Sequence, residues 1–274
     1  MPSRKIKLSV IIPCYNHGLY IQDAVDSVSE CRDVDYEIII IDDGSKETGT
    51  IEKLHQLKSQ GLQVITQPNL GPASARNAGI NNAKGKYILT LDADNKIHPN
   101  YIKKAIKELE SGNYDIVYGK PIFFGEDIIE RKFKVGAFTG NDLFINNSID
   151  TCAIFKKEVW TILGGYDAKI PYHGNEDWEF WLHAFTKGLK FKFLNEDLYY
   201  YRILSKSLIS KKATDIHTIN HDYILKKHFQ SFKEAMTASY QYGKMYNRDI
   251  ANPLRASLKY LIMFFRFKTK SNDA

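Results

Sequence analysis

Two patterns of apolar positions alternate along the first 120 residues of the chain. Short continuous runs rich in Val and Ile are typical of strands buried on both faces, whereas apolar residues spaced three or four apart are typical of helices. The runs predict strands at 7–13, 36–45, 62–67, 86–92 and 114–119. The spaced positions predict helices at 19–31, 50–60, 72–83 and 98–111. Strands that alternate with helices form βαβ units, so we expect an α/β fold with a mostly parallel sheet flanked by helices.

The pattern becomes less regular after residue 120. Residues 120–150 predict loops or short strands, 151–155 a strand, and a short helix is expected from Lys156. Further on, the pattern predicts an aromatic amphipathic helix at 175–188 capped by Asn175, one or two strands at 191–202, and helix from about 215 to 267. No linker rich in Gly, Ser or Pro separates these segments. Any division is therefore approximate, and we expect a first domain at 1–212, with halves at 1–120 and 121–212, and a helical C-terminal extension at 213–274.

Composition narrows the function classes only modestly. The chain is 43% hydrophobic and 26% charged, which is ordinary for a globular protein. A net charge of +6 suits an anionic small molecule or an acidic membrane surface, and it is too weak to indicate nucleic acid as a partner. Three cysteines without a CxxC pair predict reduced thiols in a cytoplasmic protein, and they argue against zinc. No apolar run reaches the roughly 18–20 residues of a membrane span, and the short one ending at Pro13 predicts a strand rather than a signal peptide.

Polar side chains follow three of the predicted strands. They lie at 13–16, 42–45 and 92–94, and the carboxyl ends of parallel strands meet at one edge of a sheet. Asp92 and Asp94 point the same way from an extended chain, so their like charges repel. A hard divalent cation, Mg²⁺ or Mn²⁺, would relieve this repulsion and neutralise a diphosphate. The simpler alternative is two solvated aspartates in a turn.

Other residues at this edge could bind a nucleotide. Asp42 and Asp43 could accept hydrogen bonds from ribose hydroxyls or a base N–H, although an Asp-Gly turn explains them equally. Tyr15 offers a flat face for a base, or packs in the ordinary way. Arg76 could hold phosphate in bidentate fashion, or be a solvated helix arginine. The chain has neither GxGxxG nor GxxxxGK[ST], so phosphate would have to be held by the cation and Arg76.

A second acidic pair, Glu176 and Asp177, begins the aromatic helix. One carboxylate near a sugar hydroxyl could act as general base, and Trp178 or Trp181 could form an apolar platform for a sugar. The alternative is stabilisation of the helix N-terminus by negative charge.

Taken together, five segments resemble the inverting family 2 glycosyltransferases, which have the Rossmann-like GT-A fold. The segments are SVIIPCYN (9–16), IIIIDDGSKETGT (38–50), NLGPASARNAGI (69–80), GKYILTLDADN (85–95) and LGGYDAKIPYHGNEDWEFWLHA (163–184). Their order and spacing over about residues 7–205 make the resemblance specific.

The resemblance implies a role for each matched residue. Pro13, Tyr15, Asp43 and Arg76 would line the nucleotide site, with Asp42 close by. Asp92 and Asp94 match the DxD motif, Asp94 as the direct ligand of Mn²⁺ or Mg²⁺ and Asp92 nearer the ribose. Asp177 matches the general base, and Glu176 would hold the acceptor or the loop.

The implied reaction transfers a hexose or N-acetylhexosamine from a nucleotide sugar, with UDP as the expected nucleotide, to a saccharide hydroxyl with inversion. One position departs from the family pattern, because many relatives have a His after the late YR motif where this chain has Leu204. His173 or Lys206 could substitute for it.

Residues 253–270 combine Leu, Ile, Met and Phe with five basic residues. This composition fits a helix at the surface of an anionic membrane, or equally a terminal helix packed on its own domain. Membrane contact through 251–274 would place the chain at the inner face of the cell membrane and suit a lipid-linked saccharide acceptor, as in assembly of bacterial surface polysaccharide or glycolipid.

Two further functions remain open at this point. A polyprenyl-phosphate sugar synthase has an anionic acceptor and needs no base. A non-catalytic nucleotide-sugar binding module would tolerate the departure at Leu204, but the carboxylates of Asp92, Asp94 and Asp177 count against it. A nucleotidyltransferase is disfavoured, because residues 14–20 lack the Gly- and basic-rich loop that such enzymes commonly have after the first strand.

Overall fold

The computed structural model of the chain describes most of its length. The described residues are 6–31, 33–126, 134–137, 142–204, 213–252 and 255. The chain divides into two compact units, Met1–Lys227 and His228–Ala274. The first unit therefore ends 15 residues beyond the boundary at 212 that the sequence pattern indicated, and it includes a helix that the pattern assigned to the extension.

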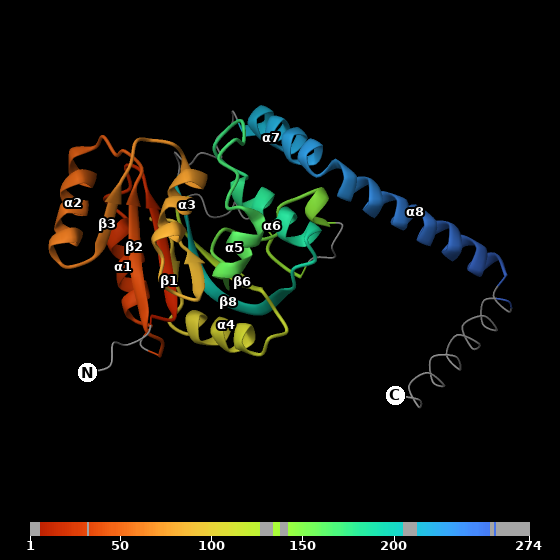
Figure 1. The fold of residues 1–274 in the computed structure, drawn as a ribbon, viewed down its shortest axis with the longest axis horizontal. Helices are drawn as coiled ribbons and strands as arrows, with labels where there is room; N and C mark the ends of the chain where they lie inside the picture. Colours follow the sequence, from red (N-terminus) through yellow and green to blue (C-terminus); the bar gives the residue numbers. More distant parts are fainter. Residues whose placement is uncertain are drawn as a thin grey trace. The chain divides into compact units, whose positions relative to one another are not determined.

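The first unit is built on one sheet of eight strands (Figure 1). They are β1 (Leu8–Cys14), β2 (Tyr36–Asp42), β3 (Gln63–Thr66), β4 (Tyr87–Thr90), β5 (Lys96–Ile97), β6 (Ile116–Gly125), β7 (Ile154–Lys156) and β8 (Phe191–Ile203). Their order is β3-β2-β1-β4-β7-β6-β8-β5. The pairs among β3, β2, β1 and β4 are parallel, as is β6 with β8, whereas β7 and β5 pair antiparallel to their neighbours. The predicted α/β class with a mostly parallel sheet is confirmed.

The described helices lie between or after these strands. They are α1 (Ile21–Ser29), α2 (Thr48–Ser59), α3 (Pro72–Asn82), α4 (Tyr101–Glu110), α5 (Lys157–Leu163), α6 (Glu176–Thr186), α7 (Ala213–Lys227) and α8 (Phe229–Ala251), with a 3₁₀ turn at Asp142–Phe144. Each helix predicted in the first 120 residues is present. The pattern missed β5 and the extension of β6 to Gly125, and residues 191–203 form one strand.

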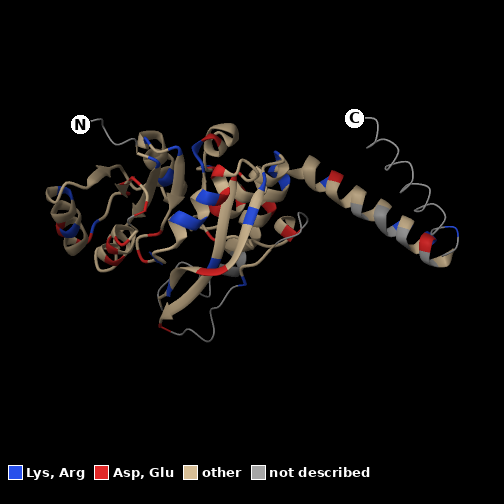
Figure 2. Cartoon of the chain, turned by 90° about the horizontal axis from the view of Figure 1, so that it is seen from below, with Lys and Arg blue, Asp and Glu red and all other residues tan. Residues whose placement is uncertain are grey.

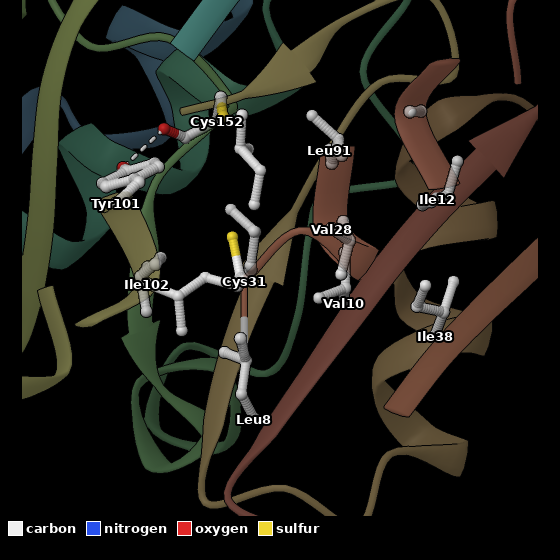
Figure 3. Packing of buried hydrophobic residues seen from close by; sticks show 14 of the residues in the cluster. Leu8, Val10, Ile12, Val28, Cys31, Ile38, Leu91, Tyr101, Ile102 and Cys152 are labelled. Carbon is white, nitrogen blue, oxygen red and sulfur yellow. Dashed lines mark hydrogen bonds between the residues drawn. The ribbon is translucent and has the colours of Figure 1, made fainter. Parts of the chain in front are cut away.

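Alternation along β1 sends its side chains into two different layers. Val10 and Ile12 enter a core shared with α1 and α4, where Val28 and Ile102 lie close by (Figure 3). The buried Tyr101 hydroxyl donates to the Cys152 carbonyl oxygen at 2.8 Å and ties α4 to the segment before β7 (Figure 3).

Ile11 points to the opposite face of the sheet, where α3 packs on β1 and β2. A Cβ at Gly79 of α3 would lie 2.4 Å from Ile11 Cγ2, so only glycine permits this close approach. Tight packing of α3 fixes Arg76, one turn earlier, above the carboxyl ends of the strands.

The second unit consists of α8 and the residues after it. Among the described residues, no helix combines the length and the apolar character that crossing a membrane would require. Figure 2 shows Lys and Arg interspersed with Asp and Glu along the described elements. Most of the proposed membrane-contacting segment 251–274, all but 251, 252 and 255, lies outside the described residues.

Candidate active site

The carboxyl ends of β1, β2 and β4 bring three polar segments to one edge of the sheet. Cys14 at the end of β1 lies opposite Asp42 at the end of β2, and Ile11 lies opposite Thr90 at the end of β4. The segments that follow these strands therefore start side by side, as their sequence positions predict.

Tyr15 and Pro13 are the predicted nucleotide-site residues from the first strand. Pro13 lies in β1 opposite Ile41 and is partly buried. Tyr15 follows the strand, and 39% of it is exposed. A side chain exposed at the strand end is consistent with the predicted stacking on a base, which stays a prediction.

Asp43 is buried and holds the loop after β3. Its Oδ1 accepts hydrogen bonds from Gln67 Nε2 at 2.7 Å and the Leu70 amide at 2.9 Å, and its Oδ2 accepts one from the Gly71 amide at 2.8 Å. Asp42 accepts a hydrogen bond from the Ser45 amide at 2.9 Å. Both carboxylates therefore order loops at the strand ends, and their predicted contacts with ribose and base stay predictions.

Asp92 and Asp94 lie just beyond β4, where a bonded loop fixes their backbone. The Asp92 carbonyl accepts from the Asn95 amide at 3.0 Å, and the Asp94 carbonyl accepts from Arg202 Nε at 2.9 Å. The carboxylates themselves are partly exposed, 33% for Asp92 and 19% for Asp94. Burial and the charge of Asp92 raise the pKa of Asp94 to about 6. Asp94 thus lacks full compensation for its charge.

Arg76 joins the two acidic pairs. Its Nη2 lies 2.8 Å from Asp92 Oδ1 and its Nη1 lies 2.7 Å from Glu176 Oε1, although Glu176 is 100 residues further along the chain. Burial alone would lower the pKa of Arg76, but the charges of Asp92 and Glu176 outweigh it and raise the pKa. The guanidinium is only 4% exposed, so a bidentate contact with diphosphate would require one of these ion pairs to open.

Glu176 and Asp177 differ in how fully their carboxylates are bonded. Glu176 is buried, and its Oε2 accepts from the Gly174 amide at 2.8 Å while Oε1 pairs with Arg76. Asp177 is partly exposed; its Oδ2 accepts from Asn147 Nδ2 at 2.9 Å and its Oδ1 from the Trp178 amide at 2.8 Å. Burial and the charge of Glu176 raise the pKa of Asp177 to about 7. A carboxylate with that pKa can accept a proton near neutral pH.

Sequence reasoning missed Asn147 and a further carboxylate, Asp150. Burial, with the charge of Asp92 adding to it, raises the pKa of Asp150 well above its ordinary value, and Asp177 and Arg76 also act on it. Asp150 therefore lies within reach of the charges of both acidic pairs. Both residues come from 120–150, where the apolar pattern has no regular period, so no signal pointed to them.

The proposed sugar platform at Trp178 and Trp181 is wrong, because both side chains are fully buried. Trp178 donates from its indole N–H to the Leu143 carbonyl at 2.7 Å. The apolar spacing predicted that these residues share one helix face, and that face packs into the core. Asn175 does precede α6, but its side chain makes no capping hydrogen bond there.

The structure describes one of the two candidates for the missing late histidine. His173 lies against the loop between β3 and α3, since a Cβ at Gly71 would fall 2.2 Å from its Cε1. Lys206 lies outside the described residues. A histidine that the sequence did not suggest, His17, has its Nδ1 4.0 Å from Asp94 Oδ2.

Comparison with known proteins places this geometry in a family. Residues 9–159 match the family described as Glycosyl transferase family 2. The chain belongs to this family. Its predicted family and its assignment as a glycosyltransferase are thereby confirmed at the family level.

Relatives of this family 2 chain include the chondroitin synthase of Pasteurella multocida strain Pm70. The two are 30% identical over 247 residues, which cover 88% of this chain and 25% of that protein. The chain thus spans a quarter of the length of that relative.

Two solved structures share the fold. TarS 1–349 of S. aureus in complex with UDP-GlcNAc has a TM-score of 0.63 at 19% identity, over 78% of this chain and 64% of that one. The mannosyltransferase PcManGT of Pyrobaculum calidifontis, in complex with GDP-Man and Mn²⁺, has a TM-score of 0.58 at 19% identity, over 75% of this chain and 59% of that one. The GT-A prediction is confirmed.

The donor set at Asp92 and Asp94 fits a hard divalent cation. Both groups offer carboxylate oxygens at one strand end, and the charge of Asp92 beside Asp94 is one that a cation would balance. The described residues contain no cluster of three or more His, Cys, Asp or Glu arranged for metal binding. Mg²⁺ and Mn²⁺ commonly take their remaining ligands from phosphate oxygens and water, so two carboxylates suffice.

Proposed function

We propose that the chain transfers a hexose or N-acetylhexosamine from a nucleotide sugar to a saccharide hydroxyl with inversion at the anomeric carbon. The proposal rests on two ion pairs of Arg76, one with Asp92 at 2.8 Å and one with Glu176 at 2.7 Å. They join the strand-end carboxylates to the acidic pair of α6 in one network of ion pairs. A donor bound at the first pair and an acceptor bound at the second would meet there.

Asp177 is the general base of the proposed reaction. It takes the proton of the acceptor hydroxyl as that oxygen forms a bond to the anomeric carbon and the bond to the diphosphate breaks. A pKa of about 7 supports this role, since the ionised carboxylate is available at neutral pH and still basic enough to bind the proton. Asn147 orients the carboxylate through Oδ2, and Oδ1 accepts from the Trp178 amide of the same helix.

Asp94 and Asp92 would hold Mn²⁺ or Mg²⁺. When bound, the cation supplies positive charge to the departing nucleoside diphosphate. Asp42, Asp43, Pro13 and Tyr15 form the nucleotide site in this proposal. Support for a cation comes from PcManGT, whose structure contains Mn²⁺ with GDP-Man.

UDP is the proposed nucleotide, and an α-linked donor would give a β-linked product. TarS in complex with UDP-GlcNAc supports a UDP-sugar donor. PcManGT in complex with GDP-Man makes a GDP-sugar the alternative donor to be tested. The relative named chondroitin synthase supports a saccharide acceptor. We place the reaction in assembly of bacterial surface polysaccharide or glycolipid, at the cytoplasmic face of the membrane, with contact through 251–274.

A polyprenyl-phosphate sugar synthase is the second candidate. It would need no base, and the raised pKa of Asp177 favours the saccharide acceptor over it. The ordered carboxylates likewise argue against a binding module without activity.

The test is a panel of UDP- and GDP-sugars with release of nucleoside diphosphate as the readout, in Mn²⁺ and in EDTA. The proposal predicts release from one UDP-sugar in Mn²⁺ and little in EDTA. Release that is equal in EDTA would overturn the cation role of Asp94, and no release with any donor would overturn the function.

A further inference from the structure

The loop that enters α6 has a left-handed backbone. Gly174 and Asn175 are consecutive residues in this region, with φ of 101° and 73°. Glycine and asparagine are the residues that adopt this region most readily, so most other residue types would be strained here. α6 begins at the next residue, Glu176, without a side-chain cap from Asn175. Contacts from elsewhere therefore have to fix the position of the acidic pair.

Asn220 of α7 supplies these contacts. Its Oδ1 accepts from the Tyr172 amide at 3.1 Å, and its Nδ2 lies 3.0 Å from the Tyr172 carbonyl and 2.7 Å from the Gly174 carbonyl. The side chain is fully buried. A buried amide whose donor and acceptor both bind one loop fixes that loop more tightly than a single hydrogen bond would.

Gly174 connects this clamp to the site. Its carbonyl accepts from Asn220, while its amide donates to Glu176 Oε2 at 2.8 Å. The other oxygen of Glu176 pairs with Arg76, which also holds Asp92. Displacement of Gly174 would therefore disturb the bonding of Glu176 and the start of the helix that carries Asp177.

α7 also supports the first turn of α6. The rings of His217 and His221 stack on Trp178 with centroids 5.5 and 5.2 Å away. Trp178 directly follows Asp177, so α7 contacts the chain on both sides of the acidic pair.

We propose that Asn220 is a positioning residue, which fixes the loop 172–175 and thereby the orientation of Glu176 and Asp177 for transfer. The inference rests on the proposed function of that pair. It makes α7 part of the catalytic unit, although the sequence pattern assigned 213–274 to an extension.

A purely structural role for Asn220, docking α7 on the domain, is the competing explanation. Tyr223, one turn later on α7, provides a matched control because its hydroxyl donates to Asp167 Oδ2 at 2.9 Å, away from the loop. Tyr223→Phe removes a docking hydrogen bond and leaves the clamp intact.

The experiment compares Asn220→Ser, Tyr223→Phe and the unaltered chain by amide hydrogen exchange and by transfer kinetics. We expect Asn220→Ser to speed exchange of the amides at 172–176 at least tenfold and to lower kcat about tenfold, with the donor KM changed less than twofold. Tyr223→Phe should leave all three near the unaltered values. The positioning role would be overturned in favour of docking of α7 if Asn220→Ser lowered kcat and also raised the donor KM. Equal effects of Asn220→Ser and Tyr223→Phe would overturn it as well.

Two further outcomes are distinguishable. Faster loop exchange in Asn220→Ser with unchanged kcat overturns the positioning role while the proposed function stands. If the unaltered chain transfers no sugar, the proposed function fails, and the exchange data then test the clamp alone. Should Asn220→Ser not fold, the unaltered chain suffices: Tyr172 and Gly174 amides that exchange as fast as exposed amides without a hydrogen bond contradict a clamp.

Discussion

The two acidic pairs of the site share one arginine but are compensated unequally. In the strand-end pair, Asp92 is bonded to Arg76, and the pKa of Asp94 is raised to about 6. In the helix pair, Glu176 is bonded to Arg76, and the pKa of Asp177 is raised to about 7. Each pair therefore has one carboxylate that is neutralised and one that is not.

The difference between the pairs lies in what the uncompensated member can receive. Asp94 lies at a strand end beside Asp92, and two carboxylates at one strand end suit the divalent cation of the proposed function. Asp177 lies in the first turn of α6 with one amide on each oxygen, which suits the proposed role as proton acceptor. One buried arginine thus links the pair proposed to bind a cation to the pair proposed to accept a proton.

Loss of the proton acceptor should have the largest effect. We expect Asp177→Asn to lower transfer about 10²–10⁴-fold, the usual contribution of a general base, while nucleotide affinity changes less than threefold. Transfer assays and calorimetry with UDP measure the two quantities. Glu196→Gln, at an exposed position of β8, serves as control and should retain activity. Full activity of Asp177→Asn would favour the polyprenyl-phosphate synthase.

Removal of the Arg76 guanidinium should break its ion pairs with Asp92 and with Glu176 at once. Arg76→Met leaves Asp92 and Glu176 without their partner, and we expect it to lower the free energy of unfolding by about 3–5 kcal/mol. Urea denaturation measures this loss. Lys104→Met removes an exposed ion pair with Glu196 and should cost under about 1 kcal/mol. If the two variants are equally stable, Arg76 does not compensate the pairs as described.

Asp94→Asn tests whether the strand-end pair holds the cation. We expect Mn²⁺ to increase the affinity of the unaltered chain for UDP about tenfold, since a bound cation joins the carboxylate to the diphosphate. Calorimetry with and without Mn²⁺ should show that Asp94→Asn loses this increase and Asp177→Asn keeps it. An increase that survives in Asp94→Asn would place the cation elsewhere.

The smallest effect concerns the pKa of Asp177 itself. The amide of Asn147 stabilises the ionised carboxylate and lowers its pKa, so Asn147→Ala should raise it. Because the base must be ionised, the acidic limb of kcat/KM against pH should move to higher pH, by up to about one unit. The exposed neighbour Asn146 gives the control, and Asn146→Ala should leave the limb in place. A limb that moves to lower pH in Asn147→Ala contradicts the hydrogen bond's role.

Sequence alone predicted the positions of the strand-end carboxylates well. β1, β2 and β4 are continuous apolar runs, and the positions of Asp42, Asp92 and Asp94 follow from where those runs end. Parallel pairing then brings these ends together without any knowledge of distant contacts.

The position of the helix pair, Glu176 and Asp177, depends on contacts that the local sequence pattern does not encode. The ion pair of Arg76 with Glu176 spans 100 residues, and the antiparallel β7 separates β4 from β6 in the sheet. Asn147 and Asp150 come from an aperiodic segment, and Asn220 from a helix assigned to the extension. Long-range pairing decides these positions, so the sequence pattern could not place them.

The most direct test of the central claim is a titration of the Asp177 carboxyl carbon by NMR in the unaltered chain, assigned by comparison with Asp177→Asn. Burial and the charge of Glu176, which Arg76 offsets only in part, predict a midpoint near pH 7. A midpoint near the ordinary value of about 4 would contradict it, because Asp177 would then be as well compensated as its neighbour.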